Sequence, residues 1–145
     1  MTEPFATSIV VRGYELDTQG HLNQAEYLHY AEHARWEFLR TWGITQDKLL
    51  ASGVGPVTME TTIRFLRELR GGDQVDVSCA FEWGQGKSFR LAQRFVLADN
   101  TLAAELTAVC GLLDLTERRL VHDPKERLSA LADDPGSFGA NDTRA

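Results

Sequence analysis

The chain has 145 residues and a mass of 16.2 kDa, with 43% hydrophobic and 25% charged residues. These proportions are typical of a globular protein and exclude a wholly disordered, collagen-like or coiled-coil chain. The length predicts one domain whose core is large enough to fold without a disulfide or a structural metal ion. The formal net charge of −6, with no basic run, argues against a nucleic-acid partner, because contacts to phosphate dominate that affinity.

Several features of the sequence bear on where the protein is found. No apolar run approaches the roughly 18 to 20 residues that a membrane-spanning helix needs, so no membrane partner is expected. Residues 1–4 have no basic region followed by an apolar stretch, so a signal peptide is not expected. Cys79 and Cys110 are far apart and form no C-x-x-C pair, which favours two buried, reduced side chains. Together these features predict a cytoplasmic protein.

The first half of the chain predicts a strand followed by a long helix. The strand is expected over residues 5–14, and a polar turn follows over residues 16–21. Asn23 is a favourable N-cap for the helix, and Glu26 stands three residues later, an arrangement that resembles a capping box. Apolar residues then recur in steps of three and four, which predicts a broad apolar face that ends before Gly43. They are Tyr27, Leu28, Ala31, Ala34, Phe38, Leu39 and Trp42.

The second half of the chain changes to a period of two, which is typical of strands. A short helix is predicted first, over residues 45–51. The predicted strands cover residues 57–65, 75–83, 89–97 and 102–115. The turns between them, at residues 71–73, 84–86 and 99–100, are short enough for hairpin-type links. We therefore expect four strands in antiparallel succession after the long helix.

These elements predict an α+β domain. Because the long helix is apolar around much of its surface, only a curved sheet could cover it. We expect an antiparallel five- to six-stranded sheet wrapped around one long central helix. The domain is predicted to cover residues 1–132, with a short helix at residues 124–132. Residues 133–145 are polar, rich in turn formers and without periodicity, so a disordered C-terminal tail is predicted there.

The turn before the long helix combines residues that could carry out chemistry on a carbonyl group. Asp17 stands just before the predicted helix N-terminus, where backbone N–H groups around Asn23 and Gln24 have no partner within the helix. Such groups can polarise a carbonyl and stabilise an oxyanion, and the helix dipole favours an ionised carboxylate nearby. That carboxylate could attack a carbonyl or activate a water molecule. From the residues alone, an ordinary turn aspartate is the competing interpretation.

This turn resembles a motif of hotdog-fold thioesterases of the 4-hydroxybenzoyl-CoA thioesterase type. Their pattern is D-x-x-G-H-[VL]-N-N-x-x-Y, followed on the helix by Y-x-E-x-A-R, and this chain has D-T-Q-G-H-L-N-Q-A-E-Y from Asp17 and Y-A-E-H-A-R from Tyr30. Gln24 departs from the second Asn of the pattern. The resemblance covers residues 5–120. It implies a hotdog fold that pairs sheet to sheet into a homodimer or homotetramer, with active sites at the dimer interface.

The resemblance also implies an activity and a set of site residues. The activity is hydrolysis of an acyl-CoA or acyl-carrier-protein thioester to a carboxylic acid and a free thiol, without a metal or other cofactor. Asp17 would be the nucleophile or general base, His21 a supporting residue, and the helix N-terminus the oxyanion hole. The predicted catalytic residues are Asp17, His21, Asn23 and Gln24. The predicted substrate-binding residues are Gly20, Tyr27, Arg35, Lys87 and Ser88.

Several of these residues have a structural interpretation as well. His21 could instead satisfy a backbone carbonyl of the turn, and Asn23 could act only as the N-cap. Tyr27 could pack in the core, and Arg35 could pair with Glu32 at a spacing of i, i+3. Lys87 and Ser88, together with arginines near strand ends, could contact the phosphates of coenzyme A or a pantetheine arm.

Other classes of function remain as alternatives. Residues 29–33 match H-x-x-E-H, a zinc-binding motif that would place His29 and His33 on one helical face. No third ligand is evident in the sequence, and the resemblance already accounts for Glu32, so no metal site is predicted. A hotdog dehydratase or hydratase and a non-catalytic acyl-binding module are the other two alternatives.

Overall fold

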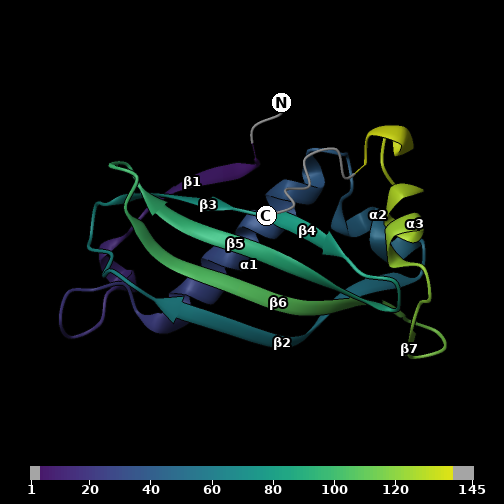
Figure 1. Cartoon of the computed structure of the whole chain (residues 1–145), viewed down its shortest axis with the longest axis horizontal. Coiled ribbons are helices and arrows are strands. Elements are labelled where there is room, and N and C mark those ends of the chain that lie inside the picture. Colours follow the sequence, from purple (N-terminus) through teal and green to yellow (C-terminus); the bar gives the residue numbers. More distant parts are fainter. Residues whose placement is uncertain (1–3, 139–145) are drawn as a thin grey trace.

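The computed structural model describes residues 4–138, in which an antiparallel sheet lies across one long helix (Figure 1). The helices are α1 (Gln24–Arg40), α2 (Gln46–Ala51) and α3 (Pro124–Ser129), with short 3-10 helices η1 (Gly13–Glu15) and η2 (Pro135–Ser137). The strands are β1 (Ala6–Val10), β2 (Val54–Phe65), β3 (Gln74–Ser78), β4 (Ala80–Trp83), β5 (Ser88–Leu97), β6 (Leu102–Asp114) and β7 (Arg119–Leu120). The predicted α+β class with one long central helix is confirmed.

Helix α1 begins where the sequence predicts and ends at Arg40, two residues before Trp42, the last residue of the predicted helix. The side-chain oxygen of Asn23 accepts a hydrogen bond from the backbone N–H of Ala25 at 3.0 Å, which makes Asn23 the N-cap. Oε1 of Glu26 lies 3.3 Å from Nδ1 of His29, so the arrangement that resembles a capping box is not completed by the Glu26 side chain. Gly43 lies just beyond the helix with φ +76°, a left-handed conformation that glycine adopts without strain.

The order of strands in the sheet differs from the predicted succession. The order is β1-β3-β5-β6-β2, and every pairing is antiparallel. β2 therefore pairs with β6, with Thr61 opposite Ala108, and not with β3. The predicted turn at residues 71–73 contacts the chain just after β1 instead, because the N–H of Gly72 donates to the carbonyl of Val11 at 2.8 Å. A period of two shows which face of a strand is buried, but it does not identify the neighbouring strand.

The sheet of the described residues has seven strands, whereas the sequence predicts five to six. The strand predicted over residues 75–83 is interrupted at Cys79, which separates β3 from β4. β3 pairs with both β1 and β5, whereas β4 pairs only with β5. The two-residue strand β7 adds a further short pairing to β6. The interruption occurs where the chain stops pairing with β1. The alternation of apolar and polar residues continues almost unbroken through it, so the sequence pattern does not show the break.

Residues 133–138, predicted to belong to the disordered tail, pack against the domain. The backbone N–H of Asp133 donates to the carbonyl of Trp42 at 2.8 Å, and Trp42 Nε1 donates to the carbonyl of Ser137 at 3.2 Å. Phe138 is 8% exposed, and its ring centroid lies 5.0 Å from that of Trp42 and 5.7 Å from that of Phe81. Two hydrogen bonds and one aromatic side chain thus dock a polar segment whose sequence shows no helix or strand periodicity. The rest of the predicted tail, residues 139–145, lies outside the described residues.

The core lies between α1 and the sheet. Tyr30, Ala34 and Phe38 of α1 are almost completely buried, as are Phe95 of β5 and Leu106 of β6. Cys79 and Cys110 are also buried, as predicted. Within residues 4–138, no helix is both long and apolar enough to cross a membrane.

Candidate active site

The loop between η1 and α1 is a tight turn built largely by its own backbone. The N–H of Asp17 donates to the carbonyl of His21 at 2.7 Å, and the N–H of Gly20 donates to the carbonyl of Asp17 at 3.0 Å. Leu16 and Leu22 form an isolated bridge on either side of the turn. Gly20 has φ +77°, a conformation that other residues rarely adopt. The turn therefore holds residues 17–21 in one defined conformation at the N-terminus of α1.

The carboxylate of Asp17 is exposed and bonded to this turn. One of its oxygens, Oδ1, accepts hydrogen bonds from the backbone N–H of His21 at 3.1 Å and of Gln19 at 2.8 Å. These two bonds lower the pKa of Asp17 below its ordinary value, because they stabilise the charged form, and the bond from His21 has the larger effect. Asp17 is therefore an anion at neutral pH. His21 orients the carboxylate through its backbone.

This geometry predicts the acid titration of Asp17. The two hydrogen bonds stabilise the ionised carboxylate. Asp17 should therefore become protonated only at a pH below its ordinary pKa of 3.8. Recording the carboxyl carbon resonance of Asp17 by NMR against pH should give a midpoint below 3.8. In Gly20→Ala, strain at a positive φ should loosen the turn and raise the midpoint towards the ordinary value. A wild-type midpoint at or above 3.8 would contradict this description of the turn.

The predicted catalytic residues line one depression at the N-terminus of α1. It has a volume of about 520 Å³. Its lining consists of Asp17, His21, Leu22, Asn23, Gln24, Tyr27, Phe65, Leu66, Arg67 and Glu68. The loop, the first turns of α1 and the end of β2 with the segment after it therefore meet here. The structure thus brings together all four predicted catalytic residues, which are close in sequence, with the four residues 65–68, which sequence reasoning had not connected with them.

The backbone N–H groups at this end of α1 are not equivalent. The N–H of Asn23 donates to the carbonyl of Glu15 at 2.9 Å, and the N–H of Ala25 donates to the Asn23 side chain. Gln24 occupies the first position of α1, where a backbone N–H has no carbonyl partner within the helix. Of the two donors that the sequence suggests for an oxyanion hole, Asn23 is therefore already engaged, and Gln24 is the available one.

Tyr27 belongs to both the depression and the core. It is 3% exposed, and its ring centroid lies 5.0 Å from that of Phe65 in an edge-on arrangement and 5.4 Å from that of Phe95. Burial raises the pKa of the Tyr27 hydroxyl, so it is a neutral group at neutral pH. The packing alternative for Tyr27 is therefore confirmed, and the side chain still forms part of the wall beside Asp17.

Arg35 contacts the sheet and not Glu32. Its Nε donates to Oε1 of Gln93 at 2.9 Å, and its Nη1 lies 3.4 Å from Oγ1 of Thr58. Gln93 is 1% exposed and also donates to the carbonyl of Ala31 at 3.0 Å, so it joins β5 to α1. Sequence reasoning did not assign a role to Gln93, although the break that it makes in the alternation of its strand was the signal. The bonds to Gln93 hold Arg35 against the sheet, away from the predicted i, i+3 pairing.

Arg35 also lines a mainly apolar cavity between α1 and the sheet. The cavity has a volume of about 110 Å³ and is distinct from the depression that holds Asp17. Its walls include the acidic Glu32 and the cationic Arg35, with Thr58 and Cys110, beside a larger set of apolar side chains. The apolar members are Trp36, Phe38, Leu39, Pro56, Val57, Phe81, Phe89, Leu91 and Leu128. Such a cavity suits an apolar group and offers one cationic side chain at its wall.

Lys87 and Ser88 lie at the other end of the sheet. Lys87 ends the turn between β4 and β5, and Ser88 is the first residue of β5. This turn lies at the end of the sheet near α2 and α3, whereas the loop before α1 lies at the opposite end (Figure 1). Lys87 lines a depression of about 390 Å³ together with Arg119 and Arg127. Within one chain, the structure does not bring Lys87 and Ser88 to Asp17.

Comparison with known proteins identifies the family. A sequence model of the Thioesterase-like superfamily matches residues 11–131, which is most of the chain. The chain belongs to this superfamily. The acyl-CoA thioester hydrolase YbgC of Escherichia coli is 34% identical to it over 104 residues, which are 69% of this chain and 78% of YbgC. The resemblance found in the motif of the turn is therefore confirmed.

Two further similarities show how far the likeness of this thioesterase-like protein extends. The acyl-acyl carrier protein thioesterase ATL3 of Arabidopsis thaliana is 42% identical over 74 residues, which are 51% of this chain and 39% of ATL3. This chain thus matches well under half the length of that plant relative. A Staphylococcus aureus protein in complex with CoA superposes with a TM-score of 0.83 at 20% identity, over 99% of this chain and 88% of that protein. The predicted hotdog fold is confirmed.

The zinc motif of this thioesterase-like protein does not assemble into a metal site. His29 pairs with Glu26, at 3.3 Å between Nδ1 and Oε1, and shares an open depression with His33. Among residues 4–138, no group of three or more His, Cys, Asp or Glu side chains is arranged to hold a metal ion. The motif match therefore receives no support from the geometry.

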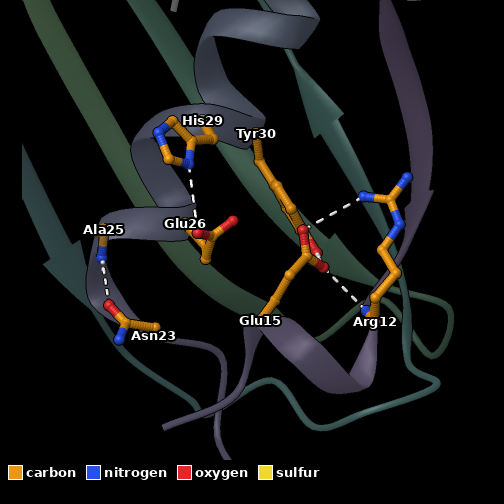
Figure 2. A network of polar contacts seen from close by, with 7 residues as sticks. All are labelled: Arg12, Glu15, Asn23, Ala25, Glu26, His29 and Tyr30. Atoms are coloured by element: carbon orange, nitrogen blue, oxygen red, sulfur yellow. Dashed lines mark hydrogen bonds and ion pairs between the residues drawn. The ribbon is translucent and has the colours of Figure 1, made fainter.

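Sequence reasoning missed a buried acidic residue beside the loop that precedes α1. Glu15 is 7% exposed, and its Oε1 accepts hydrogen bonds from the hydroxyl of Tyr30 at 2.5 Å and the backbone N–H of Arg12 at 2.9 Å (Figure 2). Its Oε2 lies 3.4 Å from Nη1 of Arg12. A glutamate close to a polar turn carries no sequence signal of burial, because its partner Tyr30 lies 15 residues away on the helix.

Proposed function

We propose that the protein hydrolyses an acyl thioester to a carboxylic acid and a free thiol. The observation that carries the proposal is that one depression holds the ionised Asp17 together with Gln24, whose backbone N–H is available at the start of α1. A negatively charged oxygen and a hydrogen-bond donor are the two groups that acyl transfer requires. The names of YbgC and ATL3, both thioesterases, support the same reaction class.

Two routes use these groups. In the first, an oxygen of Asp17 attacks the thioester carbonyl carbon, the thiolate leaves, and water hydrolyses the acyl-enzyme anhydride. In the second, Asp17 removes a proton from a water molecule whose oxygen attacks the same carbon, and the proton goes to the departing thiolate. Both routes place negative charge on the carbonyl oxygen, which the N–H of Gln24 stabilises by hydrogen bonding. His21 serves both routes, because its backbone N–H helps to hold Asp17.

The proposed substrate is an acyl-CoA or an acyl-carrier-protein thioester. YbgC is named for the first kind and ATL3 for the second. Tyr27 would contact the substrate near the thioester from the wall of the depression, and Gly20 would do so from the adjoining turn. The apolar cavity beside Arg35 would accept part of an acyl chain. Lys87 and Ser88 are too far along the sheet to serve Asp17 of their own chain, so we propose that they contribute to a site shared with a second copy. No cofactor takes part in the proposed reaction.

We further propose that the protein works as a homodimer or as a homotetramer of two dimers. β2 is an edge strand of the described sheet, and most of its residues from Thr58 onwards are exposed. Large apolar side chains on or beside it are also exposed, namely Met59 at 49%, Phe65 at 49% and Leu66 at 46%. An open edge and exposed apolar groups together favour pairing with another strand. Location in the cytoplasm stays a prediction.

The test is release of free thiol by the wild-type protein. A panel of acyl-CoA esters and a matched acyl-carrier-protein ester should be incubated with the protein, and the thiol measured with a thiol-reactive dye. We expect turnover with at least one ester. Hydration of an enoyl-CoA without thiol release would indicate a hydratase, and ligand binding without turnover would indicate an acyl-binding module. Either result would overturn the proposal.

A further inference from the structure

We propose that Glu15 and Tyr30 position the catalytic loop, by fixing residues 16–23 to the side of α1. The inference rests on the proposed function, because it gives these two residues a purpose in the geometry around Asp17. Neither residue lines the depression that holds Asp17. They are therefore positioning residues that act through the backbone of the loop.

The contact between the two side chains spans the start of the loop and the second turn of α1. Glu15 is the only buried acidic residue among the described residues, and Tyr30 is 3% exposed. The Tyr30 hydroxyl donates to Oε1 of Glu15, and the same oxygen accepts the backbone N–H of Arg12 (Figure 2). A buried carboxylate with several donors is held much more tightly than an exposed one, because breaking any bond leaves a charged oxygen unpaired.

The backbone of Glu15 makes a second connection to the helix. Its carbonyl accepts the N–H of Asn23, the N-cap of α1, at 2.9 Å. Glu15 therefore contacts α1 at two points. Its side chain bonds to Tyr30 in the second turn of the helix, and its backbone bonds to Asn23 at the N-cap. Asp17 lies two residues after this anchor, and the hydrogen bonds of its carboxylate go to Gln19 and His21 of the same loop. The position of Asp17 relative to the N–H of Gln24 thus depends on where Glu15 is held.

The protonation states of the pair keep this anchor in place. Burial opposes the charge on Glu15, but the bonds from Tyr30 and Arg12 outweigh it, so the pKa of Glu15 lies below its ordinary value. Burial, and then the bond to Glu15, raise the pKa of Tyr30 well above its ordinary value, so its hydroxyl keeps its proton. An ionised acceptor and a protonated donor form a strong, charge-assisted hydrogen bond. Since misplacing a catalytic group by about 1 Å can cost on the order of 100-fold in rate, an anchor of this kind has kinetic consequences.

The first test is Tyr30→Phe, which removes the hydroxyl and keeps the packed ring. We expect kcat for thiol release to fall about tenfold, with KM within about twofold of the wild type, because the substrate still meets the same depression. Tyr14→Phe is the matched control, since Tyr14 lies beside Glu15 in sequence and is 85% exposed. Its kinetics should equal those of the wild type. Glu15→Gln keeps a carbonyl acceptor for Tyr30 and should retain more activity than Tyr30→Phe.

The second test does not depend on any activity. Amide hydrogen exchange, followed by NMR, should become at least about tenfold faster for Asn23 and His21 in Tyr30→Phe, with the amides of β5 and β6 unchanged. Failure of wild-type thiol release would count against the proposed function only, and the exchange data would then decide the anchoring alone. An unchanged kcat, or faster exchange spread equally over the sheet, would overturn the inference. If Tyr30→Phe does not fold, the same two readouts apply to Glu15→Gln, for which we expect smaller changes in the same direction.

Discussion

Replacing Asp17 with asparagine should reduce kcat for thiol release by about 10²- to 10⁴-fold, the range that a general base or nucleophile contributes. The amide keeps the shape of the side chain, and its oxygen can still accept the backbone N–H groups of Gln19 and His21. The turn should therefore remain folded, and KM should change little. What the variant loses is the anion that attacks the carbonyl or removes a proton from water. The measurement is thiol release at saturating acyl-CoA, with circular dichroism to verify folding.

The chain provides a matched control for this substitution. Asp99 is also an exposed turn aspartate whose Oδ1 accepts a backbone N–H, that of Thr101 at 3.0 Å. Bonds from Thr101 lower the pKa of Asp99, as the turn amides do for Asp17. Asp99→Asn should therefore show whether removing a turn carboxylate affects turnover by itself, and we expect wild-type rates. Full turnover in Asp17→Asn, or equal losses in both variants, would rule out the proposed role of Asp17.

The local parts of this fold could be predicted from the sequence because short-range rules determine them. Asn23 begins α1 and Gly43 follows its end, since capping and a left-handed backbone depend on the residue at one position. The four predicted catalytic residues meet in one depression for the same reason. They lie within eight consecutive positions, and the turn that joins them needs only its own backbone and Gly20.

The non-local parts could not be predicted in this way. Pairing of β2 with β6 joins segments far apart in the chain, and alternation gives the buried face of each strand without its partner. Gln93 and Glu15 are polar residues whose partners, Arg35 and Tyr30, lie on α1, so only the packed structure shows that they are satisfied. Docking of Phe138 onto Trp42 and Phe81 likewise depends on contacts between segments far apart in the chain. Each of these contacts forms only when segments far apart in the sequence pack together.

The open edge of β2 leads to the second large effect, which concerns assembly. Met59 lies near the middle of β2 at a bulge, because Thr58 pairs with Cys110 and Glu60 with Val109 of β6. If two copies pair along β2 about a twofold axis, the middle of the strand meets its own copy there. Met59→Asp would then place two negative charges close together and replace an apolar contact, and like charges at an interface cost several kcal/mol. We expect this variant to be monomeric at micromolar concentration.

Loss of the dimer should also remove activity, because the proposed site needs a second copy. Light scattering after size-exclusion chromatography should give the mass of a dimer or tetramer for the wild type and 16.2 kDa for Met59→Asp. Its kcat/KM for thiol release should fall at least about 100-fold, since the change in free energy is several kcal/mol and each 1.4 kcal/mol is tenfold. Val10→Asp provides the control: Val10 is 54% exposed on β1, the other edge strand, and its substitution should leave assembly and activity unchanged. A fully active wild-type monomer, or a Met59→Asp variant that remains assembled and active, would show that the β2 edge is not the interface on which Asp17 depends.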